Sequence, residues 1–223
     1  MAKTDDNNVI TGTCAKRADR YAIDILGIPS LTLMETASRA VADHITDNYP
    51  SSSVTVLSGT GNNGADGICI ARILQQNNLF KGEVNVFITG NIEHATWEFL
   101  YQLSELRKSG LSFKLTGDAD ALPASDILID AVFGIGLKTQ LKEDKAMLLR
   151  KVDAKAFRHV VAVDVPSGIN SDTGELMGAG IHADTTITFG RNKTGLVTKD
   201  GPEYSGSITV KDIGIPDEAY LLS

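Results

Sequence analysis

The feature that most constrains this chain is a regular alternation between short apolar runs and longer amphipathic segments. The runs are rich in β-branched residues, and most are followed by a segment whose apolar side chains recur at helical spacing. Strands that alternate with helices form a parallel sheet covered on both faces. We therefore predict an α/β fold of three layers, α/β/α and Rossmann-like, with a mostly parallel sheet. The predicted strands are 54–57, 84–88, 112–115, 126–133, 160–164, 185–189 and 207–210.

Two helices are predicted before the first strand. One covers residues 13–26 and ends near Gly27, because glycine suits the left-handed conformation that follows a helix. The second begins at Ser30, a residue type that caps helix N-termini, and continues to Ile45. No linker or repeat divides the 223 residues. We predict a single domain over 1–223, with a mobile tail at residues 1–10.

Composition excludes several classes of function. The net charge of −7 argues against a general nucleic-acid scaffold, which would more often be basic. No apolar run approaches the ~20 residues of a membrane helix, and the first residues do not form a hydrophobic signal region. Cys14 and Cys69 have no neighbours at metal-ligand spacing. We expect a cytoplasmic protein that binds neither nucleic acid nor membrane.

Ligands of an open parallel sheet bind beyond the carboxyl ends of its strands. Three segments rich in glycine or polar residues follow predicted strands, namely 59–67, 130–136 and 164–168. The first opens a helix, where glycines and the helix N-terminus favour phosphate. It is neither a Walker A loop nor the standard dinucleotide fingerprint. A tight turn without chemical consequence is the alternative, but Asn62, Asn63 and Asp66 in one loop make it less favourable.

The other two segments each place a carboxylate in an apolar strand, with Asp130 inside one strand and Asp164 at the end of another. Asp130 needs a hydrogen-bond donor or a cation as its partner, and a structural carboxylate bonded to loop amides is the alternative. Asp164 is a candidate general acid or base whose pKa is raised by apolar surroundings, and a turn-capping residue is the alternative. Asn63, Asp130 and Ser167 offer hard oxygen ligands from adjacent strand ends, which suits an alkali or alkaline-earth cation.

Several motifs in a fixed order together resemble the NAD(P)H-hydrate epimerase family, the N-terminal half of bifunctional nicotinamide-nucleotide repair enzymes. The resemblance covers the chain from Asp19 to Pro216. It is carried by residues 33–35, 61–67, 130–136, 164–169, 172–174, 183–189, 193–196 and 212–216. The family has Gly where Ala65 stands, and Asn and Gly where Thr36 and Ser38 stand. Its second, ATP- or ADP-dependent dehydratase domain has no counterpart in this chain.

The resemblance implies an epimerase that interconverts the R and S forms of NADHX and NADPHX. It also implies a homodimer, one potassium ion per subunit, and a separate ATP- or ADP-dependent dehydratase in the same pathway. The implied potassium ligands are Asn63, Asp130 and Ser167. The implied substrate-binding residues are Asn62, Asn63, Gly64, Ala65, Asp66, Gly134, Ile135, Gly136, Leu137, Lys138, Thr139, Gln140 and Asp164.

The chemistry of such a substrate assigns a role to Asp164. The hydrate has a hydroxyl on C6 of the reduced nicotinamide ring, and the ring nitrogen expels it when an acid protonates it. Water then returns to a planar iminium from either face. We expect Asp164 to act as the acid and then as the base. A non-catalytic nucleotide-binding or protein-interaction module of the same fold is the alternative. An ordinary NAD-dependent dehydrogenase is disfavoured, because residues 86–90 end their strand without the ribose-reading acid.

Overall fold

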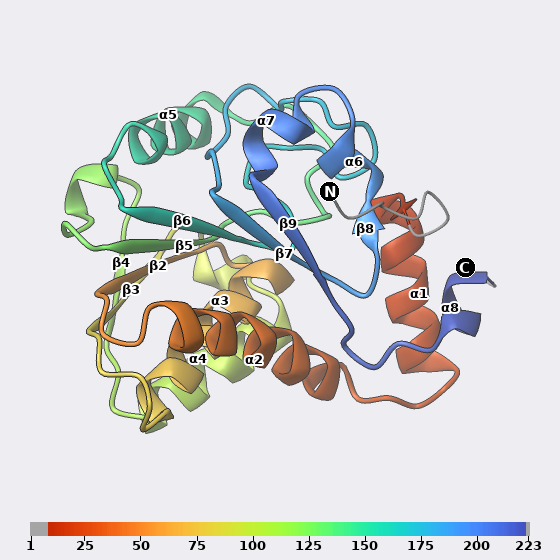
Figure 1. Ribbon diagram of the computed structural model, residues 1–223, viewed down its shortest axis with the longest axis horizontal. Coiled ribbons are helices and arrows are strands. Elements are labelled where there is room, and N and C mark those ends of the chain that lie inside the picture. The colour runs from red at the N-terminus through yellow and green to blue at the C-terminus, as the bar shows by residue number, and fades with distance from the viewer. Residues whose placement is uncertain (1–8, 222–223) are drawn as a thin grey trace.

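The computed structural model describes residues 9–221, which form a seven-stranded sheet flanked by helices (Figure 1). The strand order is β4-β3-β2-β5-β6-β7-β9, and every neighbouring pair is parallel. The predicted parallel sheet is confirmed. The strands are β2 (Val54–Ser58), β3 (Val84–Ile88), β4 (Phe113–Leu115), β5 (Ile127–Ala131), β6 (His159–Val163), β7 (Thr185–Phe189) and β9 (Ser207–Lys211).

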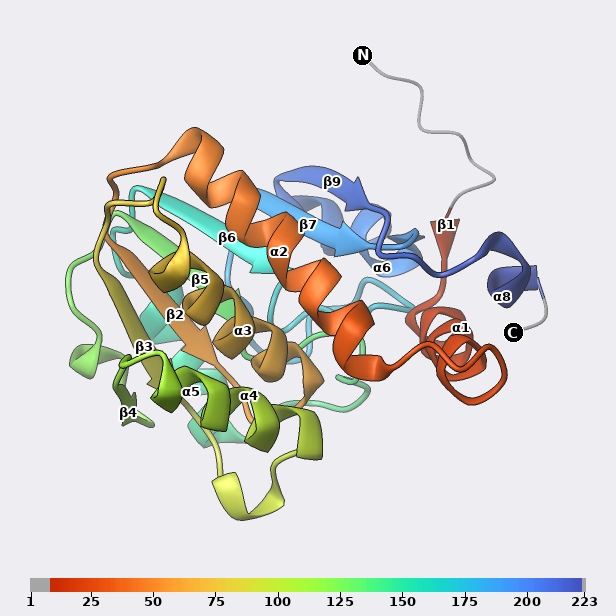
Figure 2. The same cartoon turned by 90° about the horizontal axis from the view of Figure 1, so that it is seen from below.

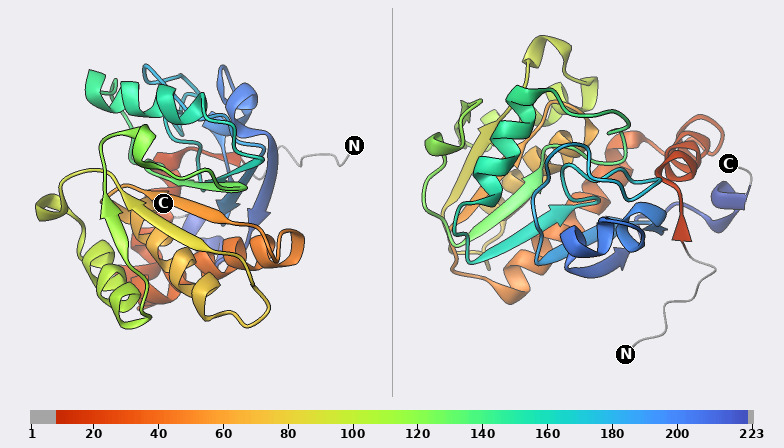
Figure 3. Two further views of the ribbon diagram at one scale, coloured as in Figure 1. Left: turned by 90° about the vertical axis from the view of Figure 1, so that its left-hand side faces the viewer. Right: turned by 90° about the horizontal axis from the view of Figure 1, so that it is seen from above.

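Helices cover both faces of this sheet, so the three-layer prediction is also confirmed. On one face lie α2 (Ser30–Asn48), α3 (Asn62–Gln76) and α4 (Trp97–Lys108), as Figure 2 shows. Over the other lie α5 (Glu143–Asp153) and the short α7 (Gly201–Ser205) (Figure 3). Single-turn 3₁₀ helices at Ile92–His94 and Ala119–Ala121 lie in the connections.

The apolar strands are explained by this double cover. In β2, Val54 and Val56 pack into the core beneath α2, α3 and α4, whereas Leu57 packs into the core beneath α5. All five residues of β2 are buried. A strand covered on both faces has no solvent-exposed side, which is why its sequence is nearly continuously apolar.

Two small groups of elements lie beyond the carboxyl ends of the strands. The first consists of α1 (Gly12–Asp24) and α8 (Asp217–Leu221), which pack against each other at one end of the molecule (Figure 1). The second consists of β1 (Val9–Ile10), paired in parallel with β8 (Asn192–Lys193), and α6 (Thr194–Val197). The side chain of Thr11 caps α1 by accepting a hydrogen bond from the backbone N–H of Cys14. These elements enclose the carboxyl edge of the sheet.

The N-terminal prediction differs from the structure in detail. Val9 and Ile10, assigned to the tail from the sequence, form β1, and residues 1–8 lie outside the described part. Two helices do precede the first strand of the main sheet. Ser30 is the first residue of α2 instead of its cap, a position taken by Pro29. Among residues 9–221, no helix is long and apolar enough to cross a membrane.

Candidate active site

A cavity of about 720 Å³ lies at the carboxyl edge of the sheet. Its walls come from α1 and α2 on one side and from the turns after β2, β3, β5 and β6 on the other. Lys193 of β8 and Tyr220 of α8 complete the lining. The position agrees with the rule that open parallel sheets bind ligands at this edge.

The turn after β2 is shorter than the sequence predicts. Helix α3 begins at Asn62, so only residues 59–61 form the turn and residues 62–67 are helical. A side chain at Gly64 would meet the carbonyl oxygen of Gly59, because a Cβ atom there would lie 2.1 Å from it. The hydroxyl of Ser58 donates to the same carbonyl, at 2.8 Å. The first N–H groups of α3 therefore start directly at the cavity, which is the arrangement that binds anions.

Three of the predicted substrate-binding residues on α3 line the cavity, namely Asn62, Asn63 and Asp66. Gly64 and Ala65 are buried behind them. Ala65 lies within the helix, and its methyl group packs into the core under α2 and α4. Its backbone φ is not positive, so the extra methyl group relative to the family's glycine causes no backbone strain.

The predicted segment 134–140 divides into two parts. Gly134, Ile135, Gly136 and Leu137 line the cavity. The next three residues are not among the described residues that line it. One of those three, Lys138, forms an ion pair with Asp172 at 2.7 Å. Thr139 and Gln140 are exposed. The contact with substrate predicted for Lys138, Thr139 and Gln140 stays a prediction.

Asp130 is fully buried at the end of β5 and is held by neutral donors. Ser167 donates its backbone N–H to Oδ2 at 2.8 Å and its hydroxyl to Oδ1 at 2.5 Å. The backbone N–H of Val132 adds a longer bond of 3.3 Å to Oδ1. Burial raises the pKa of Asp130 to about 6, and these hydrogen bonds oppose the rise only in part. The carboxylate therefore lacks a full counter-charge from the protein.

Asn63 approaches the same loop from α3. Its Oδ1 lies 3.0 Å from where a Cβ of Gly134 would stand, so a side chain at residue 134 would crowd Asn63. Its Nδ2 is buried and has no hydrogen-bond partner among the described residues. Turning the carboxamide by 180° would exchange the positions of Nδ2 and Oδ1. The exchange would break no hydrogen bond of Nδ2, because Nδ2 makes none with the described residues. Asn63, Asp130 and Ser167 thus lie around one loop, and their oxygen-rich chemistry fits a hard monovalent or divalent cation.

Residues 9–221 hold no group of three or more His, Cys, Asp or Glu side chains arranged to bind a metal. The cluster around Asp130 differs from such a group because only one of its three members is a carboxylate. A weakly charged ligand set of this kind suits an alkali cation better than zinc or another transition metal.

Asp164 follows β6 and adopts a left-handed backbone conformation with φ 65°. Oδ1 accepts three hydrogen bonds, from Lys193 Nζ at 2.6 Å, Thr188 Oγ1 at 3.0 Å and the Phe189 backbone N–H at 3.2 Å. The side chain lines the cavity, and Oδ2 receives none of these bonds. Such a φ is uncommon for a residue other than glycine and marks a position fixed by its surroundings.

The apolar surroundings predicted for Asp164 are not what the structure has, because its carboxylate is paired with a buried ammonium group. Lys193 is only 2% exposed. Its three N–H donors reach Asp164, the Thr188 hydroxyl at 2.9 Å and the Phe189 carbonyl at 2.7 Å. The ion pair therefore occupies one oxygen of the carboxylate and every donor of the ammonium group.

Lys193 is the main site residue that sequence reasoning missed. It belongs to the motif 193–196, to which no chemical role was assigned. The signal that could have found it is its place five residues after Thr188, in a largely uncharged stretch that follows a buried strand. A lysine buried at such a position requires an anionic partner.

Two further carboxylates face the cavity, Asp66 of α3 and Asp19 of α1. Burial raises the pKa of Asp66 well above its usual range, and Asp164 and Asp19 add to the rise. Burial likewise raises the pKa of Asp19 to about 6; Lys193 opposes that rise and Asp164 adds to it. Asp19, Asp66 and Asp164 therefore line one cavity with Lys193, and Glu98, Lys16 and Lys145 line it as well.

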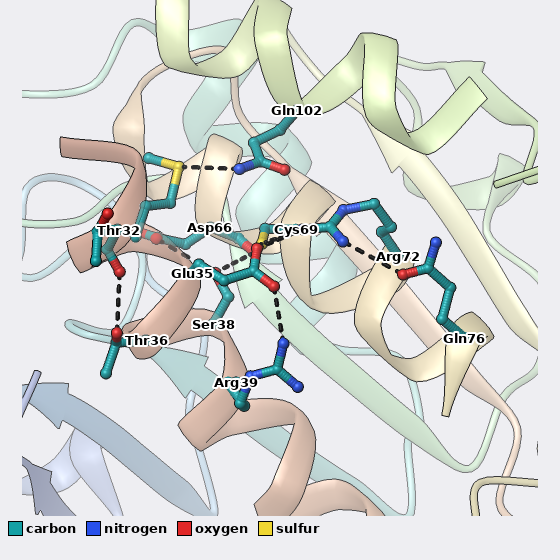
Figure 4. Close-up of polar contacts among 11 residues, drawn as sticks. Thr32, Glu35, Thr36, Ser38, Arg39, Asp66, Cys69, Arg72, Gln76 and Gln102 are labelled. Carbon is teal, nitrogen blue, oxygen red and sulfur yellow. Dashed lines mark hydrogen bonds and ion pairs between the residues drawn. The ribbon is translucent and has the colours of Figure 1, made fainter. Parts of the chain in front are cut away.

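The two departures from the family on α2 differ in consequence (Figure 4). The Ser38 hydroxyl donates to the Asp66 carbonyl at 3.3 Å and lies 3.5 Å from its Oδ1. Thr36 is exposed and donates only to the carbonyl of Thr32, one turn earlier. Glu35, the residue before Thr36, accepts hydrogen bonds from Arg72 and from the Cys69 thiol and so connects α2 to α3. Ser38 therefore touches a cavity residue, and Thr36 does not.

Comparison with known proteins agrees with this geometry. The family model described as YjeF-related protein N-terminus matches residues 30–195. Proteins named NAD(P)H-hydrate epimerase are similar over most of their length. The one from Limosilactobacillus fermentum is 42% identical and covers 91% of this chain and 95% of that protein. The one from Limosilactobacillus reuteri is 39% identical and covers 93% of this chain and 97% of that protein.

The same fold is found in a solved structure. The crystal structure of the yeast protein ynu0, YNL200c, superimposes with a TM-score of 0.75 at 22% identity. The match covers 92% of this chain and 87% of the yeast chain. At this identity the likeness supports the fold alone.

Proposed function

The chain belongs to the family of YjeF-related N-terminal domains, and on that basis we propose that it is an NAD(P)H-hydrate epimerase. The reaction interconverts the R and S forms of the hydrated cofactor, NADHX or NADPHX. One observation carries the proposal: relatives with this name align over more than nine-tenths of the chain, and the matched region contains the cavity with the Asp164–Lys193 ion pair.

The reaction needs little covalent help from the protein. The lone pair of the ring nitrogen expels the hydroxyl on C6 once that hydroxyl is protonated, and water adds to the resulting iminium from either face. The transient ring carries a positive charge, which a fixed carboxylate stabilises. Asp164 suits this role because Lys193 and two further donors hold Oδ1 in place while Oδ2 remains for the substrate. The same carboxylate stabilises the iminium again as water returns to C6.

The dinucleotide part of the substrate would bind at the other end of the cavity. The N-terminus of α3, a helix of 15 residues, supplies backbone N–H groups and a partial positive charge for phosphate. Lys145 of α5 also lines the cavity, and its ammonium group donates to the Thr89 hydroxyl at 3.0 Å. Residues 134–137 face the same space. Asn62, Asn63 and Asp66 would contact the sugar and the hydrated ring.

A potassium ion is part of the proposal, held by Asn63, Asp130 and Ser167. The support is the fully buried Asp130 with neutral donors only, together with the unpartnered carboxamide of Asn63. When bound, the ion supplies the missing counter-charge for Asp130. The protein's own residues then hold the loop 132–137 against the substrate, since Ser167 Oγ accepts from the Phe133 N–H at 2.9 Å.

The remaining parts of the proposal concern assembly and context. We include a homodimer, and a separate ATP- or ADP-dependent dehydratase that consumes the S form. We place the activity in the cytoplasm, because its substrate forms from reduced nicotinamide nucleotides. Size-exclusion chromatography with light scattering tests the dimer, and a coupled assay with added dehydratase tests the pathway.

The first experiment measures R-to-S interconversion by chromatography with the purified chain. Wild type should exceed the uncatalysed rate, and Asp164→Asn should lose about 10²–10³-fold, the typical contribution of one preorganised electrostatic group. Asp144→Asn, an exposed carboxyl on α5, is the matched control and should leave the rate unchanged. Thermal stabilisation by the hydrate without turnover in wild type would favour the non-catalytic module. An unchanged rate in Asp164→Asn would overturn the role of that residue.

A further inference from the structure

The pairing of Asp164 with Lys193 leaves one requirement of the proposed reaction unmet. The hydroxyl on C6 leaves as water only if it receives a proton. Lys193 directs its three donors to Asp164, Thr188 and Phe189 and has none left for the substrate. Asp164 itself is half of an ion pair with Lys193 at 2.6 Å, and its Oδ1 is already taken by three donors. Another group in the cavity must therefore supply the proton.

Asp19 is a carboxyl group to which the proposed function assigns no role. It lies on α1, between buried Ala18 and exposed Arg20, and it lines the cavity together with Ala15 and Ile23 of the same helix. No hydrogen bond or ion pair to its side chain occurs within residues 9–221. A half-buried carboxyl without a hydrogen-bond partner costs stability, so its presence on the cavity-facing side of the helix requires a reason.

Asp19 lies near the ion pair of Asp164 and Lys193. Asp164 and Lys193 act on it electrostatically from the sheet edge, and Tyr220 of α8 lies close enough to feel its charge. Burial raises the pKa of Tyr220, which therefore remains a neutral phenol at physiological pH. The other charged groups that line the cavity are Lys16, Asp66, Glu98 and Lys145.

We infer that Asp19 is the general acid that protonates the leaving hydroxyl, while Asp164 acts on the same substrate as a fixed carboxylate. The inference rests on the proposed function. The proton moves from the Asp19 carboxyl to the oxygen on C6, the C6–O bond breaks with its electron pair on the departing water, and the ring nitrogen forms the C=N bond. Water then adds to C6, the C=N pair returns to nitrogen, and the proton that water releases returns to Asp19. No proton is consumed.

Asp66 is the rival donor, and its environment differs. The Ser38 hydroxyl donates to the backbone carbonyl of Asp66 and lies 3.5 Å from Asp66 Oδ1. The Asp66 side chain therefore packs toward α2 as well as toward the cavity. Burial raises the pKa of Asp66 well above its usual range, whereas it raises that of Asp19 to about 6. A general acid works best when its pKa lies close to the working pH, and Asp19 meets this condition.

The test is the pH dependence of kcat/KM for R-to-S interconversion, with the uncatalysed rate subtracted at each pH. In wild type, kcat/KM should fall about tenfold per pH unit above about pH 6, as Asp19 loses its proton. Asp19→Asn should lower kcat about 10²–10³-fold and abolish this limb. Asp19→Glu should restore part of the rate and keep the limb. Asp24→Asn, an exposed carboxyl on the same helix, is the matched control and should match wild type.

The outcomes separate the two proposals. If wild type does not exceed the uncatalysed rate, the proposed function fails. If wild type is active and Asp19→Asn keeps both rate and limb, the role of Asp19 fails and the proposed function stands. Loss of the limb in Asp66→Asn but not in Asp19→Asn would also overturn the inference. A circular dichroism spectrum and a thermal melt of each variant show whether a loss of rate reflects unfolding.

Discussion

Asp130 and Asp164 lie at the carboxyl ends of neighbouring strands of one sheet, and both are buried carboxyl groups. The charge of their hydrogen-bond donors differs. Asp130 receives only neutral donors, from Ser167 and Val132. Asp164 receives a buried ammonium group from Lys193. A buried charge needs an opposite charge, so we expect the first position to require an external cation, whereas the second has an internal one. This difference is why we propose an ion site at Asp130 and a substrate site at Asp164.

Removing the internal cation should produce the largest effect. Lys193→Met leaves the Asp164 carboxylate buried without a counter-charge, and breaking such a pair costs about 3–5 kcal/mol of the free energy of unfolding. Urea denaturation measures the loss, and the interconversion rate should fall with it.

The double variant Lys193→Met/Asp164→Asn is the control, because it removes both charges together. It should recover at least half of the lost stability, and it remains informative if the single variant fails to fold. Equal stability of the single and double variants would show that Lys193 stabilises the fold by packing alone, and the comparison with Asp130 would lose its basis.

Supplying an external cation should have the next largest effect, and only at Asp130. A ligand at 100 times its dissociation constant stabilises by about 2.7 kcal/mol, and each kcal/mol raises Tm by about 2–4 °C in a chain of this size. We expect potassium chloride to raise Tm above its value in choline chloride at equal ionic strength, measured by differential scanning fluorimetry.

Two isosteric variants locate that response. Asp130→Asn should lose the difference between potassium and choline, whereas Asp164→Asn should keep it. A potassium response that survives Asp130→Asn, or that disappears in Asp164→Asn, would place the ion at a different carboxylate from the one that the hydrogen bonds indicate.

The same pair of residues shows how far sequence alone can reach. Both carboxyl groups were singled out from the sequence, because an Asp inside or directly after an apolar run is visible in a linear pattern. Ser167 was predicted to lie near Asp130 as a fellow cation ligand, but its hydrogen bonds to Asp130 were not predicted. Pairing of Asp164 with Lys193 was not predicted either, because it depends on how the chain returns from β7 through β8, a two-residue strand that pairs only with β1.

Helix α1 gives a second instance. Its amphipathic pattern predicted a helix, and the structure confirms one from Gly12 to Asp24. Nothing in that pattern states which element the helix packs against. Its contact with α8 joins segments about 200 residues apart in the chain, and this long-range packing brings Asp19 to the cavity. Local periodicity sets the elements, whereas the cavity depends on contacts between distant segments.

Altering a single hydroxyl should give the smallest effect and the finest test. Thr188 Oγ1 accepts from Lys193 and donates to Asp164, so Thr188→Val leaves one donor of a buried ammonium group unsatisfied. The expected cost is about 1.5–3 kcal/mol, the range for hydrogen bonds to charged groups. Thr186 lies two residues earlier on β7, is equally buried, and donates instead to the carbonyl of Ser205.

Thr186→Val is thus matched in strand, burial and lost hydroxyl, but it leaves the Asp164–Lys193 pair intact. Both variants should lower stability in urea, and only Thr188→Val should also lower kcat, by about three- to tenfold, the equivalent of about 0.7–1.4 kcal/mol in the barrier. A matching fall in kcat for Thr186→Val would mean that the rate follows general stability. An unchanged kcat for Thr188→Val would mean that Lys193 alone suffices to hold Asp164 for reaction.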